Sequence, residues 1–270
     1  MAPTTVYTHG SQTRYGDSAA PQVRPSDREI KVGTAWAPLL DPAVNEVGAR
    51  ELPSTRACEY ARNGRLLLLE NLFSPAECAR LIEAAESIGF GRTDYPKTYR
   101  GNLRLITTDP MLTEAVWQRL REQLPAVLTV DGETWHAVGL NECWRLAKYF
   151  PGDRFEAHCD ACYDRSDTER SMFTVNVYMN DVAHGGATRF YSGTREDTET
   201  PVLSVQPEAG LAVIFRQPPE EQLLHDGEEL AGGTKYLFRS DVMYRLQPKS
   251  EAAEAALDAA MQNAMESFGA

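Results

Sequence analysis

Two side chains of metal-ligand type lie two positions apart in the stretch EAHCD, where His158 is followed by Asp160. In an extended chain, residues i and i+2 project to the same face, so both side chains can reach one ion. A third ligand has to come from elsewhere in the chain, and His225 is a candidate. Two imidazoles and one carboxylate on one face of an octahedron leave three coordination positions open, which suits non-haem Fe(II) and oxygen. The spacing alone is weak support, because a surface His-x-Asp and an unrelated histidine would give the same pattern.

Cys159 and Cys162 form a C-x-x-C pair beside these residues. A zinc site would require a second such pair, or a Cys/His partner at zinc-site spacing, and the sequence has neither. The chain contains 5 cysteines, an odd number that argues against a disulfide framework. We therefore interpret the pair as thiols near a site, with a redox or zinc role as the alternative.

The elements that position these residues are predicted to form one domain over residues 61–250. Residues 1–60 are rich in Pro, Thr, Ser, Ala and charge, without a sustained period, which predicts an extended or loosely packed N-terminal segment. The Ala-rich sequence of residues 251–270 favours a C-terminal helix.

Two helices are predicted ahead of the strand-rich part of this domain. The first covers about residues 74–89, since Ser at the N-cap, Pro at the first helical position and Glu three residues after the cap begin it. The second covers about residues 109–124 and is stopped by Pro125. Each carries an apolar stripe, so both are expected to cover one face of a sheet.

From about residue 137 to residue 246, short runs rich in aromatic and β-branched residues alternate with Gly, Pro and Asp turns, as in SMFTVNVYMN, LAVIF and KYLFRSDVMYRL. Many short strands at this spacing, without helices between them, indicate an antiparallel sandwich or barrel. The predicted fold class is therefore mainly β with flanking helices.

A lysine, Lys235, stands ten residues after His225 at the start of a predicted strand, and Tyr149 stands nine residues before His158. These spacings resemble the prolyl-4-hydroxylase-like branch of the 2-oxoglutarate/Fe(II) oxygenases. That family has a Tyr nine residues before an H-x-D, a distal His, and a Lys ten residues beyond it. The ordered spacings make the resemblance specific.

Three further motifs of the family are matched in order. They are T-x-x-x-Y-[LM]-N at residues 174–180, Gly-Gly-x-T-x-F at residues 185–190, and P-x-x-G at residues 207–210. The resemblance covers roughly residues 65–246. It implies that the core is a double-stranded β-helix, the jelly-roll of cupin-like proteins.

The resemblance also implies a reaction. His158, Asp160 and His225 would hold Fe(II), and 2-oxoglutarate would chelate the iron through its keto and C1 carboxylate oxygens. O2 would take the last position, 2-oxoglutarate would be decarboxylated to succinate, and a C–H bond would be hydroxylated, with ascorbate as a reductant by analogy. Halogenating relatives have a small residue in place of Asp160, so its carboxylate favours hydroxylation.

Three residues are expected to bind the co-substrate. The ammonium of Lys235 would pair with the distal carboxylate, because iron, Asp160 and 2-oxoglutarate together leave one negative charge to balance. Tyr178 matches the family position that hydrogen-bonds the co-substrate, and Tyr149 is expected to line the same pocket. The alternatives are a solvated strand lysine and two core tyrosines.

Three more residues are expected near the substrate. Arg239 shares strand parity with Lys235 and is expected to project into the same pocket, where it could hold a substrate carboxylate. The alternative is an ion pair with a structural acid, Asp241 or Asp153. Asn176 and Arg104 are the other expected substrate contacts; the latter lies in a polar loop that could cover the barrel mouth.

The favoured substrate is a small molecule, either a free amino acid or a biosynthetic intermediate. One alternative is a peptidyl-prolyl hydroxylase acting on a protein or peptide. Two others are a cupin-like metal-binding protein without oxygenase activity and a jelly-roll binding module without catalysis.

The composition excludes other classes of partner. A formal net charge of -12 disfavours nucleic acid. The sequence has no apolar run near the roughly 20 residues of a membrane helix, and its start lacks the features of a secretory signal. We therefore expect a cytoplasmic protein without a membrane partner, and the sequence does not indicate its oligomeric state.

Overall fold

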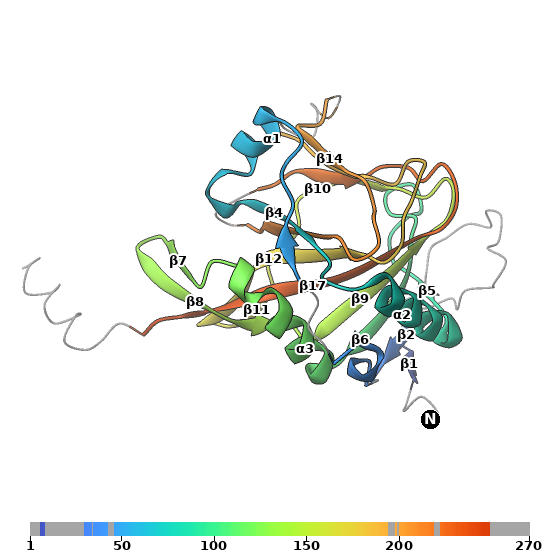
Figure 1. Cartoon of the computed structure of the whole chain (residues 1–270), viewed down its shortest axis with the longest axis horizontal. Helices are drawn as coiled ribbons and strands as arrows, with labels where there is room; N and C mark the ends of the chain where they lie inside the picture. Colours follow the sequence, from blue (N-terminus) through green and yellow to red (C-terminus); the bar gives the residue numbers. More distant parts are fainter. Residues whose placement is uncertain are drawn as a thin grey trace, which may run out of the picture.

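The structure is a computed structural model that describes residues 6–8, 30–33, 35–42, 46–193, 198, 200–218 and 222–248. Within these residues, a large β-sheet and a small one enclose a cavity. The two longest helices pack on the other face of the large sheet (Figure 1). The predicted fold class, mainly β with flanking helices around a jelly-roll core, is confirmed.

The larger sheet contains, in order of pairing, β1 (Val6–Thr8), β2 (Ile30–Val32), β6 (Leu103–Thr108), β9 (Cys143–Tyr149), β17 (Lys235–Leu246), β12 (Glu169–Tyr178), β15 (Ala212–Arg216), β4 (Leu66–Glu70) and β3 (Gly48–Ala49). Its side pairings add β5 (Gly91–Arg92), β11 (Asp164–Ser166), β8 (Glu133–Leu140) and β7 (Val127–Val130). The smaller sheet contains β10 (Phe155–His158), β16 (His225–Gly227), β13 (Thr188–Phe190) and β14 (Leu203–Val205).

The two central strands of the larger sheet, β12 and β17, set which residues face the cavity. They pair antiparallel, with Asn176 opposite Arg239 and Tyr178 opposite Leu237. Because side chains alternate along a strand, residues 174, 176 and 178 share a face with residues 237 and 239. The intervening residues, among them Val175 and Phe238, are buried in the main hydrophobic cluster on the opposite face.

The helices on that opposite face are α2 (Pro75–Ile88) and α3 (Pro110–Leu120). The capping box predicted at Ser74 is present: its hydroxyl accepts from the N–H of Glu77, whose carboxylate accepts from the N–H of Ser74. Leu81 of α2 and Leu112 of α3 are fully buried in the main cluster. The remaining short helices are α1 (Thr55–Tyr60), η1 (Ala37–Leu39), η2 (Arg62–Gly64) and η3 (Arg121–Gln123).

Part of the N-terminal segment packs tightly, which departs from the loose segment expected for residues 1–60. Strand β2 pairs parallel with β6, and Trp36 is 0% exposed in the main cluster, 6.4 Å from the ring of Phe238. The backbone N–H of Trp36 donates to the carboxylate of Asp109, the N-cap of α3. A single tryptophan among prolines and charged residues has no period, so periodicity could not predict this packing. The helix predicted for residues 251–270 lies outside the described residues.

No helix in the described part of the chain has the length and apolar character to cross a membrane.

Candidate metal centre

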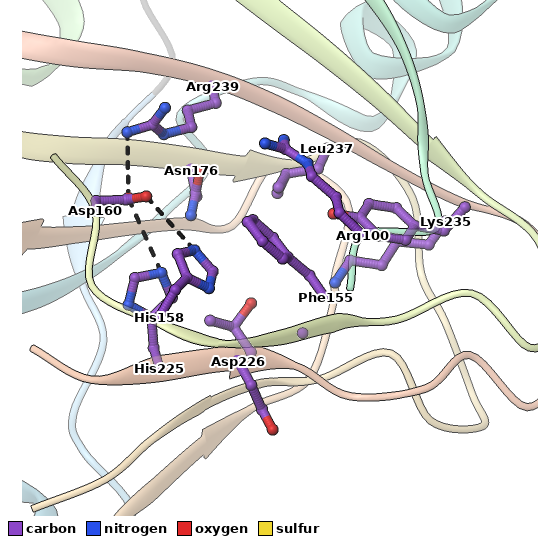
Figure 2. A pocket seen from close by; sticks show the side chains of 13 residues that line it. Arg100, Phe155, His158, Asp160, Asn176, His225, Asp226, Lys235, Leu237 and Arg239 are labelled. Carbon is purple, nitrogen blue, oxygen red and sulfur yellow. Dashed lines mark ion pairs between the residues drawn. The ribbon is translucent and has the colours of Figure 1, made fainter. Parts of the chain in front are cut away.

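A cavity between the two sheets contains most of the residues expected to do chemistry. The space between its lining atoms is about 480 Å³, counting the open mouth. Its charged lining residues are Arg100, Asp160, Asp226, Lys235 and Arg239, together with the imidazoles of His158 and His225. Figure 2 shows the side chains of His158, Asp160 and His225 at one end of this space, with Arg239 beside Asp160 and Lys235 at the other end.

The three predicted metal ligands meet at one end of this cavity. His158 ends β10 and His225 begins β16, and the two residues are directly opposite each other in the antiparallel pair. Asp160 follows β10, with one carboxylate oxygen 3.6 Å from Nε2 of His158 and the other 3.9 Å from Nε2 of His225. One ligand atom from each residue lies within 4.8 Å of the other two. Strand pairing therefore brings together residues 67 positions apart in the sequence.

Both imidazoles are held in the tautomer that a metal ligand requires. Nδ1 of His158 lies 2.8 Å from the carbonyl oxygen of Glu156, and Nδ1 of His225 lies 2.8 Å from that of Leu223. A carbonyl oxygen only accepts, so each Nδ1 must carry the proton. The unprotonated Nε2 of each ring then faces Asp160, where it can coordinate an ion.

The charge state of these groups suits a divalent cation. Burial, aided by the nearby His158, lowers the pKa of His225 to about 4, so this imidazole is neutral at pH 7. Burial alone would raise the pKa of Asp160, but the charge of Arg239 and the contacts with both histidines hold it well below its ordinary value. Two imidazoles and one carboxylate are a donor set that fits iron(II).

Lys235 lies at the other end of the cavity and is 3% exposed. Its ammonium donates to the carbonyl oxygen of Gly186 at 2.5 Å and lies over the ring of Tyr149, 5.2 Å from the centroid. Burial lowers the pKa of Lys235 to about 8, so it is largely protonated at pH 7. A buried ammonium that faces a cavity is suited to binding a carboxylate.

Gly186 makes room for this lysine. Its φ of +73° favours glycine, and a Cβ there would lie 3.1 Å from Leu230 Cδ1 and 3.5 Å from Lys235 Cδ. The Gly-Gly motif therefore has a local physical role beside the cavity.

Tyr178 stands one layer behind the cavity. Its hydroxyl donates to Oγ1 of Thr188 at 2.7 Å, and Thr188, unlike Tyr178, is among the described lining residues. Thr188 is the threonine of the Gly-Gly-x-T-x-F motif, so the sequence held a signal for it that our prediction did not use. Tyr149 lines the cavity as expected.

Arg239 lines the cavity but also has acidic partners. Its Nη2 lies 3.2 Å from Oδ2 of Asp160 and 3.2 Å from Oδ1 of Asp241. The alternative ion pair with Asp241 is therefore present, whereas Asp153 lies 3.4 Å from Lys97 instead.

Arg104 is not among the described lining residues, and it lies in strand β6 rather than in the expected loop, whereas Arg100, in the loop before β6, lines the cavity. The guanidinium of Arg100 lies 4.4 Å from the ring centroid of Phe155, which itself stacks on His158 at 3.7 Å. An isolated β-bridge joins Arg100 to Phe155 and carries this arginine to the cavity wall. The sequence analysis named Arg104 of this region as a substrate contact, and the structure brings Arg100 to the cavity instead.

Among the described residues, the group that could hold a metal ion does not include Cys159 or Cys162.

Residues 144–240 match the family model of the 2OG-Fe(II) oxygenase superfamily, a range that contains every predicted site residue except Arg104. No curated protein matches the chain. A prolyl hydroxylase of Trichoplax adhaerens, solved with a hypoxia inducible factor peptide fragment, is 14% identical with a TM-score of 0.50, over 68% of this chain and 86% of that chain. This likeness supports the jelly-roll fold.

Two further solved structures are similar. The viral collagen prolyl hydroxylase from Paramecium Bursaria Chlorella virus-1 is 18% identical, with a TM-score of 0.48, over 68% of this chain and 97% of that chain. HygX from Streptomyces hygroscopicus, with nickel and 2-oxoglutarate bound, is 12% identical, with a TM-score of 0.46, over 71% of this chain and 87% of that chain.

Proposed function

Since this chain belongs to the 2OG-Fe(II) oxygenase superfamily, we propose that it is a dioxygenase that hydroxylates an unactivated C–H bond of a small molecule. We assign His158, Asp160 and His225 as the iron ligands and Lys235 as the partner of the distal carboxylate of 2-oxoglutarate. The observation that supports this proposal most directly is that the three metal-ligand residues and the buried ammonium of Lys235 line the same cavity.

Charge balance supports the assignment of Lys235. Iron brings two positive charges, Asp160 one negative charge and 2-oxoglutarate two negative charges, so one negative charge remains. The buried ammonium neutralises it, as a low-dielectric cavity requires.

When bound, iron and 2-oxoglutarate supply the oxidising chemistry: one oxygen atom of O2 enters succinate as CO2 is released, and the other enters the substrate hydroxyl. The protein's residues position and shield this chemistry. The carbonyls of Glu156 and Leu223 hold the two imidazoles in place, and Phe155 stacks on His158 and covers that side from water.

Polar groups near the metal ligands favour a small polar substrate over a prolyl side chain. Asn176, Arg239 and Arg100 all line the cavity. An apolar proline ring could not hydrogen-bond with Oδ1 of Asn176 or Nε of Arg239, two buried atoms without a partner, and this carries a cost in desolvation. The second candidate is prolyl hydroxylation of a peptide, favoured by the fold shared with a hydroxylase solved with a peptide fragment.

A spectroscopic experiment tests the proposed function. Anaerobic addition of Fe(II) and then 2-oxoglutarate should produce a weak visible charge-transfer band, and admission of air should release succinate. A protein that binds zinc, or no metal, would give neither signal. Succinate release screened over amino acids, proline-rich peptides and metabolite extracts would separate the two substrate classes, and omission of ascorbate would test its role as reductant.

We also propose that the protein acts in the cytoplasm. The proposal is supported by its 5 cysteines, none of which is disulfide-bonded within the described residues. Cell fractionation with an antibody against the chain would test it.

A further inference from the structure

Two buried polar atoms beside the metal centre have no hydrogen-bond partner. They are Oδ1 of Asn176 and Nε of Arg239, on residues directly opposite each other in strands β12 and β17. Both residues line the cavity, and Asn176 is 6% exposed. Buried polar atoms without partners are rare, and one explanation is a ligand that completes the site.

The guanidinium of Arg239 is held in a fixed orientation. Its Nη2 is within 3.2 Å of both Asp160 and Asp241, and 3.3 Å from Oγ1 of Thr174. Asp241 is itself fixed by Gln217, whose amide donates to Oδ1 at 2.9 Å. A guanidinium held in this way keeps its remaining N–H groups oriented without further ordering cost, which favours binding.

The orientation of Asn176 is suited to an acceptor in the cavity. Figure 2 shows its amide oxygen on the side of Arg239 and its amide nitrogen on the side of the two histidines. The nitrogen is a donor, and the neighbouring guanidinium offers further donors. A group with oxygen acceptors can therefore use the amide nitrogen of Asn176 and Nε of Arg239 at once, while Oδ1 of Asn176 requires a donor, such as the ammonium of a free amino acid.

Charge favours an anion as that group. The cavity is lined by three cationic side chains, Arg100, Lys235 and Arg239, and by two acids, Asp160 and Asp226. Asp226 is already in a two-point ion pair with Arg189, at 2.9 and 2.6 Å. Bound iron and 2-oxoglutarate would cancel each other in formal charge, so the lining residues keep a net positive formal charge in a chain whose net charge is -12.

We infer that Asn176 and Arg239 form a subsite for a carboxylate of the substrate, so that the substrate is a small organic acid such as a free amino acid. The inference rests on the proposed function and names the substrate class for it. The subsite is distinct from the position of the distal carboxylate of 2-oxoglutarate, because Lys235 and Arg239 lie at opposite ends of the cavity with Leu237 between them (Figure 2). If the substrate carboxylate binds beside Asp160, the substrate carbon that is oxidised is only a few bonds from that carboxylate. An internal prolyl residue of a peptide has no such carboxylate.

The test compares matched acids and amides. Free L-amino acids and simple organic acids, each paired with its primary carboxamide, are added to the enzyme with Fe(II), 2-oxoglutarate and air, and succinate is measured. At least one acid should exceed its amide about 10- to 100-fold in kcat/KM, the loss expected for a hydrogen-bonded charge. A panel in which no acid exceeds its amide would overturn the subsite.

Two substitutions test whether the preference for the acid over its amide depends on Asn176. Asn176→Asp has nearly the same shape but places a carboxylate beside Arg239, so the acid-to-amide ratio of kcat/KM should fall towards one. Asn176→Leu removes the donor and should also lower the ratio. Because each ratio is taken within one preparation, loss of active enzyme does not change it. Arg121→Gln, on a half-exposed side chain of η3, is the matched control and should keep the wild-type ratio.

The outcomes separate this inference from the proposed function. If both Asn176 variants keep the acid-to-amide ratio and instead raise KM for 2-oxoglutarate, the subsite belongs to the co-substrate and the inference is overturned. If the wild-type protein with Fe(II) and 2-oxoglutarate shows neither the charge-transfer band nor any succinate, the proposed function itself fails.

Discussion

Replacing Lys235 by methionine should change stability and co-substrate binding in opposite directions. Burial lowers the pKa of Lys235 from 10.5 to about 8, so the folded state holds this proton less tightly than the unfolded chain does. At about 1.4 kcal/mol per pKa unit, the buried ammonium costs about 3 kcal/mol of folding free energy at neutral pH. This cost is fully present below about pH 8 and is lost as the pH rises from about 8 to 10.5. Lys235→Met should therefore increase the free energy of unfolding of the protein without ligands by about 1–3 kcal/mol.

The same substitution should weaken the binding of 2-oxoglutarate. Removing one member of a buried charge pair costs about 2–5 kcal/mol, which corresponds to roughly a 30-fold to more than 1000-fold increase in Kd. Calorimetric titration with Mn(II) in place of Fe(II) would measure the Kd, and urea denaturation would measure the stability.

Lys148 provides the matched control. It is also buried, but its ammonium lies 2.7 Å from the carboxylate of Glu86, outside the residues that line the cavity. Lys148→Met should lower stability and leave the Kd for 2-oxoglutarate unchanged. If Lys235→Met destabilised the protein and bound 2-oxoglutarate as tightly as the wild type, Lys235 would be a structural residue and the reasoning would be refuted.

Three further predictions follow from the same contacts. The affinity for 2-oxoglutarate should fall as the pH rises above about 8, because the protonated form of Lys235 binds it; calorimetry from pH 7 to pH 9.5 measures this, and a flat profile would contradict it. Thr174→Val removes the hydroxyl that donates to Oδ2 of Asp160 at 2.7 Å and should weaken Mn(II) binding about 10- to 100-fold, measured by electron paramagnetic resonance titration. An unchanged Mn(II) affinity would show that this hydrogen bond does not position the carboxylate. Gly186→Ala should lower the free energy of unfolding by about 1–3 kcal/mol, because its φ of +73° disfavours a side chain and the new Cβ would crowd Leu230; a urea melt that matched the wild type would exclude this strain.

Local features of the chain were predictable because they depend on neighbours within a few residues. The capping box of α2 joins Ser74 to Glu77, three positions away, so its sequence pattern is sufficient. The shared parity of Lys235 and Arg239 likewise follows from the period of a strand, and both residues line the cavity.

Contacts between distant segments were predicted less well. Trp36 was not expected in the core, because no periodic pattern surrounds it. The sequence also did not indicate that Arg100, rather than Arg104, reaches the cavity, or that Thr188, which accepts from Tyr178, lines it. Each outcome depends on which strands and loops pair, which local pattern does not specify.

The sequence by itself determined the kinds of group available to the site: two imidazoles, a carboxylate and a strand lysine at spacings that resemble one family of oxygenases. Only the tertiary structure decided how they meet. The register of β10 against β16 places His158 opposite His225, and the register of β12 against β17 places Asn176 opposite Arg239. A shift of either register by one residue would turn these side chains to the other face, so the pairing of strands, rather than the spacing of residues, makes the cavity.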